Sequence, residues 1–258
     1  VWPRQWPGYD EAVSIWQPVG TPPKLNVLPL LAGTLKVTLI GMLISVPMGV
    51  GSAIFVSQHV SPRAREIVKP ALELLASIPS VVLGFFALVV LASALQSIFG
   101  WTYRLNATVA AIGLSLAVIP TIFTISEDSL RAVPRSLIEA SMALGARKWQ
   151  TTLRIVVPAA LPGIAAAILL GLGRAIGETM VVLMASGNAA VIELLDPSSS
   201  ARTVTATIAA ELGEVARGEA HWRVLFLLGV LLFVVTFVLN RIGARIVSRL
   251  HRKLMAQA

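Results

Sequence analysis

Five long apolar runs divide the chain, and each is long enough to cross a lipid bilayer as a helix. They cover about 27–55, 71–99, 107–125, 155–185 and 224–239. The ~30 Å hydrocarbon core offers no partner to a backbone N–H or C=O, so a crossing segment must bond within itself. The pattern therefore predicts an all-α, polytopic membrane protein with five transmembrane helices.

Composition excludes an ordinary water-soluble globule. Of the 258 residues, 56% are hydrophobic and 13% are charged, with a mean hydropathy of +0.80, whereas an average soluble domain is about 25% charged. The sequence contains no cysteine, which excludes disulfides, thiolate metal sites and cysteine nucleophiles.

Positive charges gather in three of the segments that connect or follow the apolar runs, which explains the net charge of +8 better than a nucleic-acid partner does. The positive-inside rule predicts that these three segments are cytoplasmic. The C-terminus, with a basic tail over 241–258, is then also cytoplasmic, and the segments 100–106 and 187–222 face outward. The basic residues are Arg63, Arg65, Lys69, Arg131, Arg135, Arg147, Lys148, Arg154, Arg241, Arg245, Arg249, Arg252 and Lys253.

Residues 1–26 are expected to lie outside the membrane, because five spans lead to a cytoplasmic C-terminus. That placement predicts an upstream signal or a further span in the native protein. Trp2, Trp6 and Trp16 together with several prolines suit an interfacial segment or an irregular connecting loop.

The outward segment 187–222 contains a short pattern of helical period. Apolar residues recur opposite Glu211 and Glu214, and Thr203 or Thr205 can serve as the N-cap. We therefore expect a short amphipathic helix at the outer surface. Its apolar positions are Val204, Ile208, Leu212 and Val215.

The loop between the third and fourth runs, about 127–158, carries the most specific motif. It reads Glu-Ala-Ser-Met-Ala-Leu-Gly from Glu139 to Gly145. Pro134 suits a helix start, and Gly145 permits the turn that ends the helix. We expect a compact helix that docks in a groove on a partner, with an ordinary helical loop as the alternative. Its shallow apolar face would consist of Ala140, Ala143 and Leu144.

This stretch resembles the EAA loop of ABC importer permeases, whose pattern is Glu-Ala-Ala, three residues, Gly, nine residues and Ile-x-Leu-Pro. Here Ser141 replaces the second alanine, and Val157 replaces the leucine. The resemblance implies a type I ABC importer permease fold over 27–240, with a cytoplasmic helix that couples to an ATPase subunit. The coupling residues that it implies are Glu139, Ala140, Ser141, Leu144, Gly145 and Ala146.

Two opposite charges, Arg174 and Glu178, lie inside the fourth apolar run. An unpaired charge at mid-membrane costs about 2.5–3.5 kcal/mol on insertion scales. Residues four apart share a helix face and can neutralise each other, so the face is expected to point at protein or a watery pathway. The alternative is an ion pair that only fixes helix packing. The neighbouring Gly171, Gly173 and Gly177 suit close helix packing.

The octapeptide from Gly173 to Met180, followed by Gly187-Asn188, is similar to the signature of the phosphate permeases of the PstC and PstA pair, and closer to PstC. The similarity extends over 28–240 and includes Gly33-Thr34 and Ile78-Pro79-Ser80. It implies that Arg174 and Glu178 serve phosphate passage. Thr179 is a further pathway candidate, as is Lys36, which could instead snorkel to the outer interface.

No phosphate-binding loop, His-Glu-x-x-His motif or nucleophile triad occurs, so we expect no catalytic residue, metal site or cofactor in this chain. The resemblance implies a bacterial inner-membrane assembly with a PstA-like permease, an ATPase dimer that binds ATP and Mg, and an external phosphate-binding protein. A permease for another oxyanion, such as sulfate or molybdate, is one alternative. A passive anion channel or scaffold is another.

Overall fold

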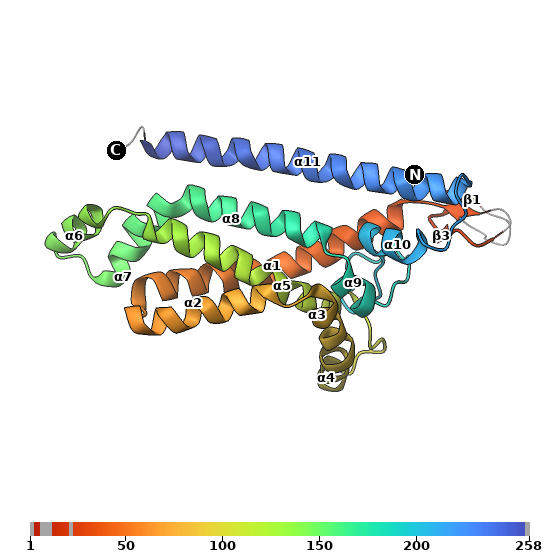
Figure 1. Cartoon of the computed structure of the whole chain (residues 1–258), viewed down its shortest axis with the longest axis horizontal. Helices are drawn as coiled ribbons and strands as arrows, with labels where there is room; N and C mark the ends of the chain where they lie inside the picture. The colour runs from red at the N-terminus through yellow and green to blue at the C-terminus, as the bar shows by residue number, and fades with distance from the viewer. Residues whose placement is uncertain (1–2, 6–11, 21–22, 256–258) are drawn as a thin grey trace. The chain divides into compact units, whose positions relative to one another are not determined.

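The computed structural model describes residues 3–5, 12–20 and 23–255, and helices dominate it, as predicted (Figure 1). Residues before α1 form two short antiparallel hairpins that the sequence did not predict: β1 (Arg4–Gln5) with β2 (Ala12–Val13), and β3 (Trp16–Gln17) with β4 (Lys24–Leu25). The helices are α1 (Leu28–His59), α2 (Pro62–Ser77), α3 (Ser80–Phe86), η1 (Ala87–Leu91), α4 (Ala92–Phe99), α5 (Ala107–Arg131), α6 (Arg135–Ala143), α7 (Lys148–Thr151), η2 (Thr152–Val156), α8 (Val157–Gly177), α9 (Met180–Ala185), α10 (Val204–Glu211) and α11 (Ala220–Met255).

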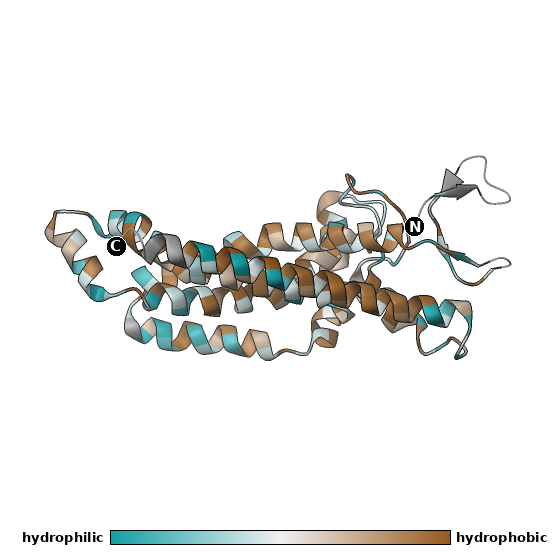
Figure 2. Cartoon of the chain, turned by 90° about the horizontal axis from the view of Figure 1, so that it is seen from above, coloured by the Kyte–Doolittle hydropathy of each residue, from teal (hydrophilic) through white to brown (hydrophobic). Residues whose placement is uncertain are grey.

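Within the described residues, five helical stretches are long and apolar enough to cross a membrane, which confirms the predicted number: Leu28–His59, Ser80–Phe99, Ala107–Arg131, Lys148–Gly177 and Ala220–Leu250. The last continues as helix to Met255, so the basic residues of the predicted tail begin inside α11. Figure 2 shows this helix hydrophobic along its first part and increasingly hydrophilic toward the C-terminus.

The predicted second span, 71–99, is wrong at its start. Residues up to Ser77 belong to α2, and the next helix begins only at Ser80. Ile78 is extended, at φ −62° and ψ 126°, as expected of a residue that precedes proline. Pro79 therefore breaks the helix instead of kinking it.

Contacts divide the chain into two compact units. Unit 1 comprises Val1–Gly41, Pro79–Ser115 and Ala175–Thr236. Trp16 is only 5% exposed in its core, so its ring packs on protein, and the interfacial placement of residues 1–26 stays a prediction; Trp2 and Trp6 lie outside the described residues. The buried core of unit 1 contains Trp16, Leu30, Val204, Leu225 and Leu228.

Helix α10 in unit 1 is shorter and more buried than expected. Thr203 caps it, as predicted, because its side chain accepts a hydrogen bond from the Ala206 N–H. The helix ends at Glu211, and its first turn is buried from Val204 to Thr207. It is therefore anchored in the core of the unit by its first turn, whereas Ala209 and Ala210 in its second turn are exposed. Its place on the outer side of the membrane stays a prediction.

Unit 2 comprises Met42–Ile78, Leu116–Arg174 and Phe237–Ala258. In this unit α6 and α7 lie together at one end (Figure 1). Helices α1, α2, α5, α6 and α8 all contribute apolar side chains to one cluster. Its buried members are Ala53, Val56, Phe123, Leu130, Val133, Val156, Ala160 and Ile164.

Candidate functional site

Arg174 stands near the end of α8 with its side chain exposed. One guanidinium nitrogen, Nη1, donates a hydrogen bond to Thr121 Oγ1 of α5 at 2.9 Å. Among the described residues, no ion pair involves Arg174. This part of unit 2 therefore presents a cation, held by one hydroxyl, inside a helix that is long and apolar enough to span a membrane.

Glu178 lies outside the helix that holds Arg174, because α8 ends at Gly177 and α9 begins at Met180. Its Oε1 accepts hydrogen bonds from the backbone N–H of Thr179 at 3.1 Å and of Val181 at 3.5 Å. Its carbonyl accepts from Thr205 Oγ1 at 2.9 Å. The prediction that the two charges share one helix face is wrong: Glu178 satisfies the free N–H groups at the start of α9.

The three glycines of α8 differ in what surrounds them. A Cβ on Gly171 would lie 2.7 Å from Ile122 of α5, so these two helices approach closely there. A Cβ on Gly173 would lie 3.8 Å from Asn240, and one on Gly177 would meet no described atom within 4 Å. The tight contact within unit 2 is thus at Gly171.

Lys36 of α1 is buried and holds the loop that follows α9. Its Nζ donates hydrogen bonds to the Glu193 carbonyl at 2.8 Å and to Ser199 Oγ at 2.6 Å. Since the side chain is only 5% exposed, it does not snorkel to an interface. In the same loop, hydrogen bonds from Ser198 hold the pKa of the Asp196 carboxyl below its usual value.

The pair Gly33-Thr34 on α1 holds the end of that loop. The Val204 N–H donates a hydrogen bond to Thr34 Oγ1 at 3.0 Å, and the same hydroxyl donates to the Leu30 carbonyl at 2.7 Å. A Cβ on Gly33 would overlap the Arg202 carbonyl oxygen and lie 2.9 Å from its carbon. Gly33 is therefore required because the backbone of the loop occupies the place of a side chain.

Gly33→Ala is expected to lower the stability of the detergent-solubilised protein by about 1–3 kcal/mol, since the added methyl group displaces backbone. Thermal unfolding followed by circular dichroism measures the effect. Gly51→Ala on the same helix is the matched control, because a Cβ there meets no atom within 4 Å. Equal melting temperatures for the two variants would contradict the proposed contact.

The predicted cytoplasmic helix is formed as α6, which begins after Pro134 and ends at Ala143. Gly145 has a positive φ of 85°. The Gly145 N–H donates to the Met142 carbonyl, and the Ala146 N–H donates to the Ser141 carbonyl. These two bonds form a Schellman motif, in which glycine is the preferred left-handed residue.

Helix α6 contains no buried residue, and the adjoining Leu144 is 90% exposed. On its other side, Ile138 packs against the core cluster of unit 2, and Ser141 Oγ lies 3.0 Å from Thr151 Oγ1 of α7. The helix is therefore fixed to the unit at a few points and free over much of its surface. That arrangement suits a docking element.

Residues 45–252 match the family described as binding-protein-dependent transport system inner membrane component. The chain belongs to this family. The permease is also similar to "Phosphate transport system permease protein PstC" of Mesorhizobium japonicum, at 36% identity over 92% of this chain and 77% of the relative. It is 36% identical to "Probable ABC transporter permease protein YqgH" of Bacillus subtilis, over 86% of this chain and 72% of that protein.

Solved structures support the same fold for the permease. A chain of the inward-facing MetNI methionine ABC transporter aligns with a TM-score of 0.63 and 23% identity, over 87% of this chain and 94% of that one. A chain of a bacterial ABC transporter that imports alginate aligns with a TM-score of 0.65 and 18% identity, over 86% and 79%. The expected ABC importer permease fold is confirmed.

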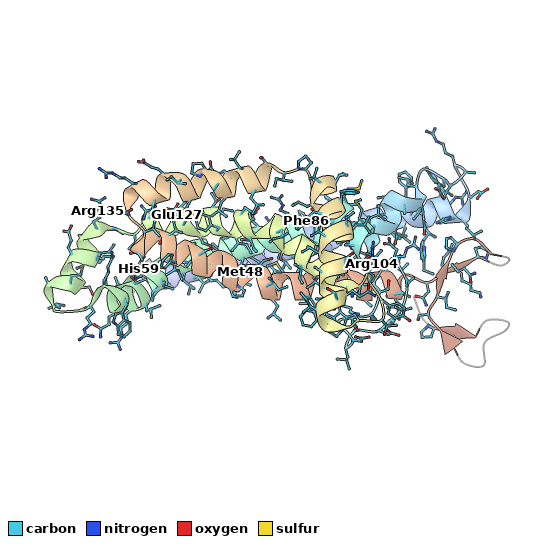
Figure 3. The ribbon with its side chains drawn as sticks, turned by 90° about the horizontal axis from the view of Figure 1, so that it is seen from below. Met48, His59, Phe86, Arg104, Glu127 and Arg135 are labelled. Atoms are coloured by element: carbon cyan, nitrogen blue, oxygen red, sulfur yellow. The ribbon has the colours of Figure 1, made fainter. Side chains whose placement is uncertain are left out.

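A buried carboxylate in unit 2 of the permease escaped the sequence reasoning. Glu127 on α5, labelled in Figure 3, has a fully buried side chain, and three cations lie within 4 Å of its carboxylate. Lys69 Nζ lies 3.3 Å away, and Arg65 and Arg131 each lie 3.8 Å away. Asp128 accepts a hydrogen bond from Lys69, which raises the lysine pKa above its usual 10.5. This cluster ties α2 to α5.

A second missed residue, Glu211, joins distant parts of unit 1. Its carboxylate accepts a hydrogen bond from Trp16 Nε1 at 3.0 Å, lies 2.7 Å from His221 Nε2, and pairs with Arg202. Trp16 comes from β3 in the second hairpin, Arg202 from the loop before α10, and His221 from the start of α11. The sequence showed Glu211 as an acidic position opposite the apolar residues of a short helix, and that pattern did not indicate these three partners.

Proposed function

We propose that this chain is the permease subunit of an ABC importer for inorganic phosphate. The observation that carries the proposal is Arg174, whose exposed guanidinium stands in a helix that can span a membrane and is held by a neutral hydroxyl. A guanidinium matches the oxygens of phosphate geometrically and lowers the cost of an oxyanion in a low-dielectric region. The relatives named as phosphate permeases support this substrate.

Other predicted pathway residues take different parts in the proposal. Glu178 shapes the turn between α8 and α9, where Thr179 donates from Oγ1 to the Gly177 carbonyl. Lys36 donates two hydrogen bonds to the loop that follows α9, so we assign it the role of holding that loop beside the phosphate path. The importance of Arg174 thus does not depend on a neighbouring carboxylate.

We infer that ATP and Mg bind to a dimer of partner ATPase subunits, with α6 docked on one of them. A PstA-like second permease and an external phosphate-binding protein complete the assembly. The charge pattern supports placing α6 and the C-terminus in the cytoplasm of a bacterial cell. This chain then supplies the path and the coupling surface, without a catalytic residue or cofactor of its own.

The test is uptake of radiolabelled phosphate into proteoliposomes that contain the assembled importer and its binding protein. We expect ATP-dependent uptake and phosphate-stimulated ATP hydrolysis, with excess sulfate or molybdate competing poorly. Efficient competition by either anion would favour the other-oxyanion permease. Uptake that continues without ATP would instead indicate the passive channel.

A further inference from the structure

An apolar groove runs along the first part of α11 in unit 1. It has a volume of about 350 Å³, and α10 with the residue that follows it forms one wall. Among the described residues, no polar side chain lines it. A Cβ on Gly229 would meet no described atom within 4 Å, so the helix surface is recessed there. The walls include Ile208 and Leu212 on one side and Leu225, Phe226, Gly229 and Phe233 on the other.

A second cavity, of about 610 Å³, adjoins this groove and shares Leu212 and Phe226 with it. Arg217 supplies the charge among the described residues that line it, and within the described chain its guanidinium has no ion-pair partner. Trp222 forms another wall and packs on Phe226, with ring centroids 4.3 Å apart. The apolar groove therefore adjoins a cavity that is lined by a cation, Arg217, and a tryptophan, Trp222.

The groove lies within a helix that can span a membrane, Ala220–Leu250. From Leu225 to Phe233 it follows the axis for about 12 Å. Trp222 stands before the groove at the start of the helix, and tryptophan is typical of the level of the lipid headgroups. Along the two cavities, a polar end at Arg217 is followed by an apolar end toward Phe233. A lipid molecule has the same sequence of a charged headgroup followed by an acyl chain.

We propose that these joined cavities bind an anionic phospholipid, with one acyl chain in the groove and the phosphate on Arg217. The apolar lining offers water no hydrogen bond, which excludes an ordered water chain as its natural content. A helix from another subunit would fill the groove but would leave the guanidinium without an anion. A phospholipid satisfies both parts, and this site does not depend on which anion the permease transports.

The test is a titration of the detergent-purified full-length chain with phosphatidylglycerol, followed by native mass spectrometry. Arg217→Gln is expected to weaken binding by about tenfold, the loss of one charge-assisted hydrogen bond. Gly229→Leu fills the groove and is expected to weaken binding as strongly. The matched controls are Arg223→Gln and Val234→Leu, which change exposed residues of the same helix that line neither cavity.

Three results would overturn the site: unchanged phosphatidylglycerol binding by Arg217→Gln, equal losses in the controls, or displacement of the lipid by inorganic phosphate at equal concentration. A further readout identifies the occupant in the assembled complex. Val230 also lines the groove, and the chain has no cysteine, so a Val230→Cys variant carries a single thiol in the groove wall. Reaction with a thiol-reactive phospholipid supports the lipid, and crosslinking to a second subunit contradicts it.

Discussion

Replacing Gly145 with valine is expected to release the ATPase subunits from the purified complex and to abolish ATP-driven uptake. Gly145 has a φ of 85°, where a side chain costs roughly 1–2 kcal/mol and a β-branched one more. The Schellman bonds at Met142 and Ser141 would be lost. The end of α6, with the exposed Leu144, would then no longer be presented in one fixed position.

Gly145→Asn is the matched control, because asparagine tolerates the left-handed conformation. No described atom lies within 4 Å of a Cβ at this position, so neither substitution creates a clash. We expect the asparagine variant to retain the ATPase subunits and most of the uptake. Co-purification followed by quantitative gel analysis measures both. Full retention by the valine variant would show that docking does not need this turn.

The parts of the fold that the sequence predicted are those with local causes. Five spans follow from runs of apolar residues, whose burial in lipid requires helical hydrogen bonding. Helix α6 follows from Pro134 and Gly145, which fix backbone angles at its two ends. Thr203 at the start of α10 is a similar case, since a hydroxyl caps a helix through its own neighbours.

The parts that sequence reasoning missed depend on distant contacts. Nothing in the apolar run from 155 to 185 marks a break after Gly177, because the turn is held by Glu178 and by Thr205 of α10. The burial of Trp16 was not predicted because its partner, Glu211, lies 195 positions away. A periodic pattern records which residues are apolar, but it does not record which distant groups satisfy a polar atom.

The same limit applies to the candidate site. The sequence identified Arg174 from the cost of a charge in an apolar run, and that argument still holds. It paired Arg174 with Glu178 by counting four residues along one helix, and the helix ends between them. Thr121, the hydroxyl that Arg174 contacts, comes from another span. The site therefore consists of one cation, Arg174, which donates a hydrogen bond to the hydroxyl of Thr121. The positive charge of Arg174 is the property to test.

Arg174→Gln is expected to reduce phosphate uptake at least about tenfold, while the variant inserts and assembles normally. Glutamine removes the charge that offsets an oxyanion, and one charge-assisted hydrogen bond contributes about 1.5–3 kcal/mol. The side chain is exposed and makes one hydrogen bond, to Thr121, so its removal opens no core cavity. Initial rates of radiolabelled uptake in proteoliposomes, at matched amounts of complex, measure the loss.

Two further variants separate charge from packing at this position. Arg174→Lys retains the positive charge but not the planar donors, and it is expected to keep a larger share of uptake than Arg174→Gln. Thr121→Val removes the hydroxyl and keeps the charge, so uptake should fall less than with Arg174→Gln. If Arg174 served only to pack α8 against α5, the thermal stability of all three variants would fall together and uptake would follow it. Near-wild-type uptake by Arg174→Gln would remove Arg174 from the phosphate path, because no other property of glutamine replaces a fixed cation.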